Sequence, residues 1–163
     1  MSANSPLFSG QVSATMVAMV GGRDIQILLV EPDAAEARRA TAVLKRTRVH
    51  NHVTVAPDAA QALAHLRREA HHYRSPLPNL ILLNADSLPQ GGEELLTAIK
   101  CDRKLEHIPV IMMSNSEADR NVRRAYDLNV NCYVHKPLTS EELDHVLETT
   151  REFWLTIAKL PSD

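Results

Sequence analysis

Several residue types and motifs are scarce or missing in this 163-residue chain. It has two cysteines, Cys101 and Cys132, which lie far apart without CxxC spacing, so two free thiols are expected instead of a disulfide scaffold. Lysine and arginine number 18 against 20 acidic residues, which leaves no basic excess of the kind that binds nucleic acid. No apolar run is long enough to cross a bilayer. We therefore expect a soluble cytoplasmic protein with no nucleic-acid or membrane partner.

The sequence also lacks the motifs of common enzyme classes. GxGxxG, the P-loop and GxSxG are all missing. Their absence argues against a dinucleotide-binding enzyme or a hydrolase, and we expect neither catalytic residues nor a resident cofactor. A chain of this length with 44% hydrophobic residues is nevertheless large enough to bury a real core.

The chain is expected to divide near residue 23. Ser, Asn, Pro and Gly dominate the first ten residues, which predicts a flexible extension over residues 1–23. The apolar residues Val12 to Val20 leave open a short helix or strand that packs on the body or on a partner. Residues 24–163 are predicted to form one domain with an extended last helix.

From Asp24 onward, apolar strand patterns alternate with amphipathic helix patterns five times. The predicted strands are Ile25–Val30, Val53–Val55, Leu80–Asn84, Ile108–Met113 and Cys132–Val134. Helices are predicted from Asp33 through Arg48, from a capping box at Asp58, after Gly91-Gly92, from a cap in Ser116–Asp119 and from a capping box at Thr139. This alternation predicts an α/β fold with a doubly wound, five-stranded parallel sheet. The flavodoxin-like strand order 2-1-3-4-5 fits a chain of this size.

Polar side chains stand at the predicted strand ends. They are Glu31 after the first strand, Asn84 and Asp86 after the third, Ser114 after the fourth and Lys136 after the fifth. In the predicted order, the first and third strands flank the switch point, where such folds bind ligands, so these side chains should converge on one crevice. Carboxylates hold hard cations such as Mg²⁺, while Ser and Lys bind phosphoryl oxygens. The set of residue types therefore points to phosphoryl chemistry.

Several separated segments resemble the receiver domain of two-component response regulators, over Asp24 to about Pro161. The segments that carry the resemblance are Ile27–Glu31, Pro78–Leu83, Ile108–Val110, Asn131–Leu138 and Glu152–Thr156. The last of them is similar to the carboxyl-terminal signature of the single-domain subfamily that serves cyanobacterial and other bacterial phytochromes. The resemblance implies a partner in a sensor histidine kinase, with a bacteriophytochrome as one candidate, or in another response regulator.

The resemblance also implies roles for individual residues. Lys136 matches the phosphoryl-binding lysine, and Pro137 matches the proline that follows it in a cis peptide bond. Ser114 matches the switch Ser/Thr, and Tyr133 matches the aromatic residue whose rotation reports activation. Glu31 matches the first of two acidic residues at the end of the first strand.

Two positions depart from the family pattern. The second acidic residue, normally a metal ligand, falls on Pro32, and the phosphoacceptor aspartate falls on Asn84. A neutral amide cannot supply the anionic oxygen that attacks phosphorus, and losing two carboxylates should make Mg²⁺ binding weak or absent. Glu31 and Asp86 remain weak candidates for metal ligands. Asn84 could be an engineered Asp→Asn substitution, but such a single change would not explain the second altered position, Pro32.

Two function classes follow. The leading one is an atypical pseudo-receiver that signals by protein contacts without phosphorylation at Asn84; the alternative is a phosphoacceptor that uses Asp86 or Asp33 in a remodelled pocket. The simpler interpretations are that Asp33 and Asp86 are solvated loop acids or helix caps, and that Lys136 pairs with Glu31 or Asp86. Ser114 as a plain strand-end residue and Tyr133 as ordinary packing also stay open.

The end of the last helix is more apolar than a monomer surface usually is. Phe153 and Trp154 are expected either to pack on the body or to form a homodimer contact. Because the last predicted helix runs almost to Asp163, signal output is expected through protein contacts on the face of the fourth helix, fifth strand and fifth helix.

Overall fold

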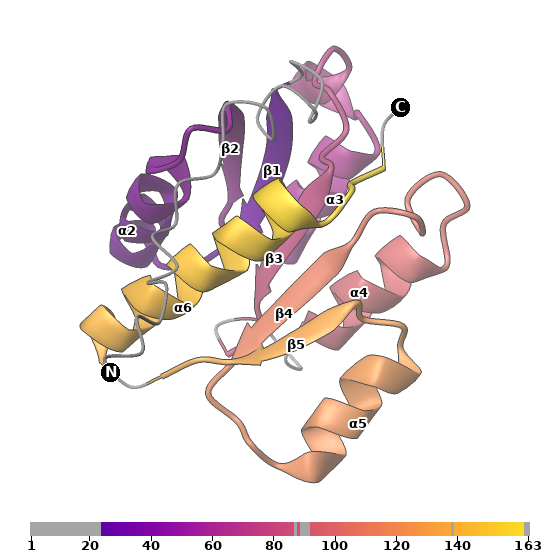
Figure 1. Ribbon diagram of the computed structural model, residues 1–163. Helices are drawn as coiled ribbons and strands as arrows, with labels where there is room; N and C mark the ends of the chain where they lie inside the picture. Colours follow the sequence, from indigo (N-terminus) through magenta and orange to yellow (C-terminus); the bar gives the residue numbers. More distant parts are fainter. Residues whose placement is uncertain (1–23, 87, 89–91, 138, 162–163) are drawn as a thin grey trace, which may run out of the picture.

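The computed structural model describes residues 24–86, 88, 92–137 and 139–161, so the predicted extension over residues 1–23 lies outside the described residues. These residues form a parallel sheet in the order β2-β1-β3-β4-β5 (Figure 1). Its strands are β1 (Ile25–Val30), β2 (Asn51–Ala56), β3 (Leu80–Asn84), β4 (Val110–Ser114) and β5 (Cys132–His135). The predicted fold class and strand order are confirmed.

Helices cover both faces of the sheet. They are α2 (Ala34–Lys45), α3 (Ala59–Leu66), α4 (Glu93–Lys100), α5 (Asp119–Asp127) and α6 (Ser140–Glu152), with a short 3₁₀ turn η1 (Ala70–His72) and a π-helical segment η3 (Phe153–Ile157) that continues α6. Helices α2 and α6 lie on one face of the sheet, and α3, α4 and α5 lie on the other (Figure 1). No helix in this described part of the chain is both long and apolar enough to cross a membrane.

The central strand β3 is buried along its whole length because both of its faces are covered. Its side chains alternate between two cores: Leu82 packs with Leu44 of α2, whereas Leu83 packs with Leu96 of α4. The register pairs Val30 of β1 with Leu83. The residues that follow, Glu31 and Asn84, are thereby brought to the same edge of the sheet.

Helix starts agree with the sequence more closely than helix ends. Asp33, Asp58 and Thr139 cap α2, α3 and α6 with their side chains, as predicted. The N-cap of α5, Ala118, lies within the predicted segment Ser116–Asp119, but it makes no side-chain capping hydrogen bond. Helix α2 was expected through Arg48 but ends at Lys45. The Arg46 N–H bonds to the carbonyl three residues back, which tightens the last turn.

Strand ends differ in a similar way. Strand β2 extends beyond the predicted Val53–Val55, and β4 begins two residues later than predicted, at Val110. The later start follows from Pro109, which has no N–H for the sheet ladder. Both cysteines are free thiols, as expected. Cys101 is exposed, and Cys132 is half-buried, where burial raises the pKa of its thiol.

Lys100 ties the end of α4 to the start of β4. Its ammonium donates to the carbonyls of Glu106 and Ile108, at 3.0 and 2.9 Å, and to Asn131 Oδ1 at 2.9 Å. The same Asn131 oxygen accepts the N–H of Val110, the first residue of β4, at 2.8 Å. Burial lowers the pKa of the Lys100 ammonium.

Replacing this ammonium should destabilise the fold. We expect Lys100→Met to lower the free energy of unfolding by about 1–3 kcal/mol, because it leaves acceptors without their donor. Urea unfolding followed by circular dichroism measures the change. Lys104→Met, at an exposed position nearby, is the matched control and should change stability by less than about 0.5 kcal/mol. Equal stability of the two variants would contradict the assigned role of Lys100.

Candidate functional site

The carboxyl ends of β1 and β3 carry a buried pair, Glu31 and Asn84, each 5% exposed. The Asn84 side-chain Nδ2 donates to Glu31 Oε2, and the Asp33 backbone N–H donates to Glu31 Oε1 at 3.0 Å. A carboxylate removed from water needs such donors, since burying it unmatched costs several kcal/mol. Asn84 is therefore a hydrogen-bond partner of Glu31 at the edge where the sequence predicted a pocket.

The side-chain oxygens at this edge of the sheet are poorly suited to bind a divalent cation. Both oxygens of Glu31 already accept hydrogen bonds, and Pro32 has no side-chain oxygen. Asp33 Oδ1 accepts the Glu36 N–H at 2.8 Å as the cap of α2, which confirms the helix-cap interpretation of Asp33. A search of the described residues finds no group of three His, Cys, Asp or Glu side chains placed to hold a metal ion.

Asp86 lies across the sheet edge against the end of β4. Its Oδ1 accepts the Ser114 hydroxyl at 2.7 Å, and its Oδ2 accepts the Asn115 backbone N–H at 2.9 Å. The Asp86 N–H in turn donates to Asn84 Oδ1 at 3.3 Å. Asp86 is exposed, as the loop-acid interpretation expects, but both of its carboxylate oxygens are also hydrogen-bonded to the end of β4. Curvature of the chain after β3 turns its carboxylate toward β4.

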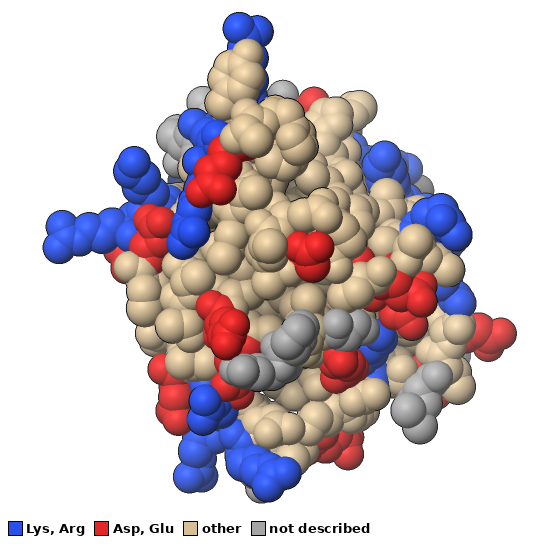
Figure 2. Space-filling model, turned by 180° about the vertical axis from the view of Figure 1, so that it is seen from behind, with Lys and Arg blue, Asp and Glu red and all other residues tan. Residues whose placement is uncertain are grey.

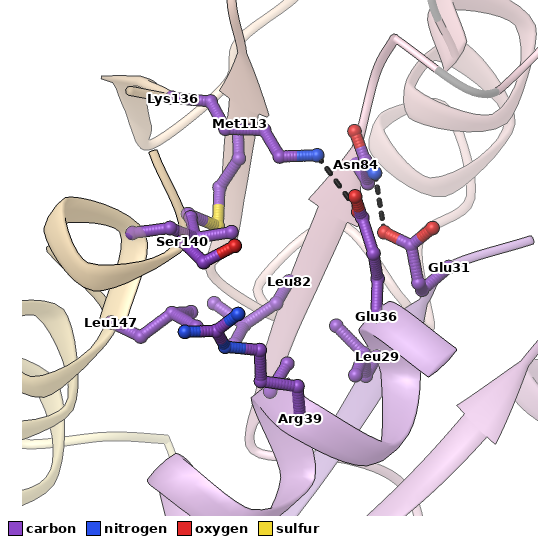
Figure 3. Close-up of a pocket in the computed structure, with 12 residues that line it drawn as sticks. Leu29, Glu31, Glu36, Arg39, Leu82, Asn84, Met113, Lys136, Ser140 and Leu147 are labelled. Atoms are coloured by element: carbon purple, nitrogen blue, oxygen red, sulfur yellow. Dashed lines mark hydrogen bonds and ion pairs between the residues drawn. The ribbon is translucent and has the colours of Figure 1, made fainter. Parts of the chain in front are cut away.

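One interpretation of the sequence was that Lys136 pairs with Glu31 or Asp86. The structure contradicts it, because Lys136 pairs with Glu36. Its ammonium lies 3.0 Å from Glu36 Oε2, and Figure 3 shows it reaching over the pocket toward that carboxylate. Glu36 stands in the first turn of α2, which begins just beyond β1 and brings the carboxylate to the same edge as Lys136. The Lys136–Pro137 peptide bond is trans, so the expected cis bond is also wrong; trans is the lower-energy isomer for most X–Pro bonds.

The predicted single crevice is divided into two depressions. The first is a cavity of about 70 Å³ between α2, the sheet and α6, with Glu31, Asn84 and Lys136 at its polar mouth and leucine side chains below (Figure 3). The second is an open depression of about 480 Å³ that includes Asp86, Ser114 and Tyr133.

Tyr133 forms part of the wall of the second depression. Its hydroxyl donates to the Ser116 carbonyl at 3.0 Å, and its half-buried ring packs against the core that α3, α4 and α5 share with the sheet. Ser114 also accepts the Ser116 N–H at 3.1 Å. Ser114 is 5% exposed and joins Asp86 to the loop after β4, so it does more than end a strand.

Sequence reasoning missed two participants, Glu36 and Arg39. Arg39 makes a two-point ion pair with Asp144 of α6, at 2.9 and 3.1 Å, and this pair holds the pKa of the Asp144 carboxyl below its usual value. Glu36 follows the cap Asp33 by three residues, a spacing that places it in the first helical turn. That spacing was the available signal for a carboxylate near the sheet edge.

The five-stranded parallel sheet and its strand order are those of a receiver domain, and a family comparison agrees. Residues 27–148 match the family described as the response regulator receiver domain, so the chain belongs to the response regulator receiver family of two-component signalling.

Individual relatives are similar over nearly their whole length. Response regulator Rcp1 of Synechocystis sp. is 34% identical over 136 residues, which is 83% of this chain and 92% of Rcp1. The structure of the phosphorylated cyanobacterial phytochrome response regulator RcpA matches with a TM-score of 0.80 at 36% identity, covering 86% of this chain and 100% of RcpA. The Mn²⁺-bound form of Rcp1 matches with a TM-score of 0.79 at 34% identity, covering 85% and 99% of the two chains.

A carboxylate at position 84 should replace the hydrogen bond to Glu31 with charge repulsion. We expect Asn84→Asp to lower the free energy of unfolding by about 1–3 kcal/mol in EDTA at pH 7, because Glu31 loses a donor and gains a like charge. Millimolar Mg²⁺ should recover part of that loss by binding the folded state. Urea unfolding with EDTA or MgCl₂ measures both effects.

Asn129→Asp is the control, since it adds the same charge at an exposed position just after α5. An Asn84→Asp variant as stable as the original chain would contradict this account of the Glu31–Asn84 pair, whereas indifference to Mg²⁺ would contradict only the expected cation binding by the variant.

Proposed function

We propose that this protein is a cytoplasmic pseudo-receiver that signals by contacts with other proteins, without phosphorylation at position 84. The observation that supports it best is the buried hydrogen bond from Asn84 Nδ2 to Glu31. Asn84 stands where the family resemblance puts the phosphoacceptor aspartate. An amide has no anionic oxygen to attack phosphorus, so the acceptor chemistry of the family is lost there.

The neighbouring aspartates are poor substitutes as acceptors. Both oxygens of Asp86 accept hydrogen bonds, from Ser114 and Asn115, and such bonds reduce the nucleophilicity of a carboxylate. Asp33 is committed to the cap of α2. Lys136, the matched phosphoryl-binding residue, is paired with Glu36. These contacts favour a binding module over an enzyme and over a second phosphoacceptor, and they also favour weak or absent Mg²⁺ binding.

The proposed partner is a sensor histidine kinase of the phytochrome type. This proposal rests on the similarity to RcpA, which is described as a phytochrome response regulator. The contact surface would be the face of α5, β5 and α6. On α5, Arg120 and Arg123 are exposed, and Arg124 pairs with Glu93 at 2.5 Å. Figure 2 shows Lys and Arg side chains gathered toward the edges of the molecule, with acidic side chains scattered between them.

A second copy of the chain is the proposed partner at the end of α6. Phe153 and Ile157 are 48% and 69% exposed, one turn apart on η3. The Trp154 and Phe153 rings contact each other edge to face, with 5.4 Å between their centroids, and Trp154 also packs against the core beneath α2 and η3. Trp154 therefore anchors the segment, while Phe153 and Ile157 present apolar surface for a homodimer.

Direct phosphorylation should fail. After incubation of the full chain with acetyl phosphate and Mg²⁺, intact mass spectrometry should find no added phosphoryl group. The Asn84→Asp variant is the positive comparison, because it restores the missing nucleophile. A gain of one phosphoryl group on the original chain, mapped to Asp86 or Asp33, would overturn the proposal in favour of the alternative acceptor.

The dimer should depend on the exposed apolar pair. We expect Phe153→Glu and Ile157→Glu to weaken self-association at least tenfold, since each puts a charge into an apolar contact. Light scattering over a concentration series measures the shift. Tyr73→Glu is the control at a 63% exposed aromatic residue elsewhere. A chain that stays monomeric at high concentration, or variants that dimerise like the control, would contradict the assigned interface.

A further inference from the structure

The contacts of Asp86 form a two-donor anion site that the chain fills by itself. One carboxylate oxygen accepts the Ser114 hydroxyl at 2.7 Å, and the other accepts the Asn115 N–H at 2.9 Å. A hydroxyl and a backbone N–H that converge on an anion are the groups that recognise phosphoryl and carboxylate oxygens. Here they converge on an anion that is covalently part of the protein.

Asn84 helps to place this anion. Its amide donates to Glu31 on one side and accepts the Asp86 N–H at 3.3 Å on the other. The side chain thus links the end of β1 to the turn that carries Asp86. An ionised aspartate at position 84 would accept on both sides and donate on neither. Asn84 therefore suits a pocket whose anion comes from Asp86.

The loop after β4 transmits the placement of Ser114 to Tyr133. The Ser114 oxygen accepts the Ser116 N–H at 3.1 Å, and the Ser116 carbonyl accepts the Tyr133 hydroxyl at 3.0 Å. Ser114 lies at 5% exposure, and Tyr133 is half-buried in the wall of the same depression as Asp86. The first hydrogen bond of this series, from Ser114 to the Asp86 carboxylate, is charge-assisted and therefore stronger than a neutral one.

We propose that Asp86 is a positioning residue whose carboxylate, although exposed, acts as a permanent built-in anion that holds Ser114, Asn115 and Tyr133 in the arrangement that a separate bound anion would otherwise have to induce. The inference rests on the proposed function, because a receiver that is not phosphorylated needs another source for this arrangement. It predicts a latent site: removing the Asp86 side chain should open a place for a small free anion.

The test is chemical rescue followed by NMR on the full chain, without phosphodonor or Mg²⁺. In Asp86→Ala, the Asn115 amide proton should move upfield as its charge-assisted bond is lost. The 3-fluorotyrosine signal of Tyr133, one of three tyrosines, should move toward that of an exposed ring. Adding sodium acetate should return both signals toward their original positions, while sodium chloride at equal ionic strength should not.

Two further variants complete the design. Asp86→Asn keeps the shape without the charge and should give intermediate shifts; it also serves if Asp86→Ala does not fold. Asp58→Ala is the matched control, because Asp58 accepts two hydrogen bonds from Gln61, at 2.7 and 3.2 Å, and follows β2, three strands from β4 and Ser114 in the order of the sheet. It should leave Asn115 and Tyr133 unchanged and show no response to acetate.

Unchanged Asn115 and Tyr133 signals in both Asp86 variants would overturn the inference, and so would shifts that acetate does not reverse. The outcome is separate from that of the proposed function. Phosphorylation of the original chain in the mass experiment would refute the proposed function whatever the NMR spectra show. Unmoved spectra would refute the role of Asp86 while leaving the absence of phosphorylation intact.

Discussion

The arrangement of this receiver depends on how one buried carboxylate is satisfied. Glu31 follows β1 into a position that is 5% exposed, where an ion loses most of its hydration. The Asn84 amide and the Asp33 N–H provide the donors that replace water. Among the common side chains of this size, an amide can both donate to Glu31 and accept from the next turn. Asn84 therefore has a structural role at this site, separate from the proposed absence of phosphorylation there.

The two functions of that amide separate the strand-end side chains into two groups. On the side of α2 and α6, the Lys136–Glu36 and Arg39–Asp144 ion pairs join β5 and α6 to α2 over the small cavity. On the side of β4 and α5, Asp86 binds the start of the loop that leads to α5. Charged side chains that the sequence placed in one crevice thus find separate partners: Lys136 makes an ion pair with Glu36, whereas Glu31 and Asp86 accept hydrogen bonds from uncharged groups.

The sequence predicted the fold well because its signals are local and repeated. Strand β3 is a continuous apolar run, and the caps Asp33 and Asp58 obey short spacing rules. Element ends were less predictable, since they depend on single backbone groups such as the missing N–H of Pro109. At the site, the residue types were foreseen but their partners were not. Whether Lys136 meets Glu31 or Glu36, and which way Asp86 turns, depends on helix placement and loop curvature, which no sequence spacing encodes.

The hydrogen bonds that Asp86 accepts from Ser114 and Asn115 have a consequence for how long a signal would last. A phosphoryl group on a receiver is added and later lost, so any arrangement that depends on it is temporary. Asp86 is part of the polypeptide and cannot be lost in that way. Under the proposed function, the duration of the output would then depend on the synthesis and degradation of the chain and on competition among its partners. The signal would depend on the amount of this protein in the cell instead of on its phosphorylation.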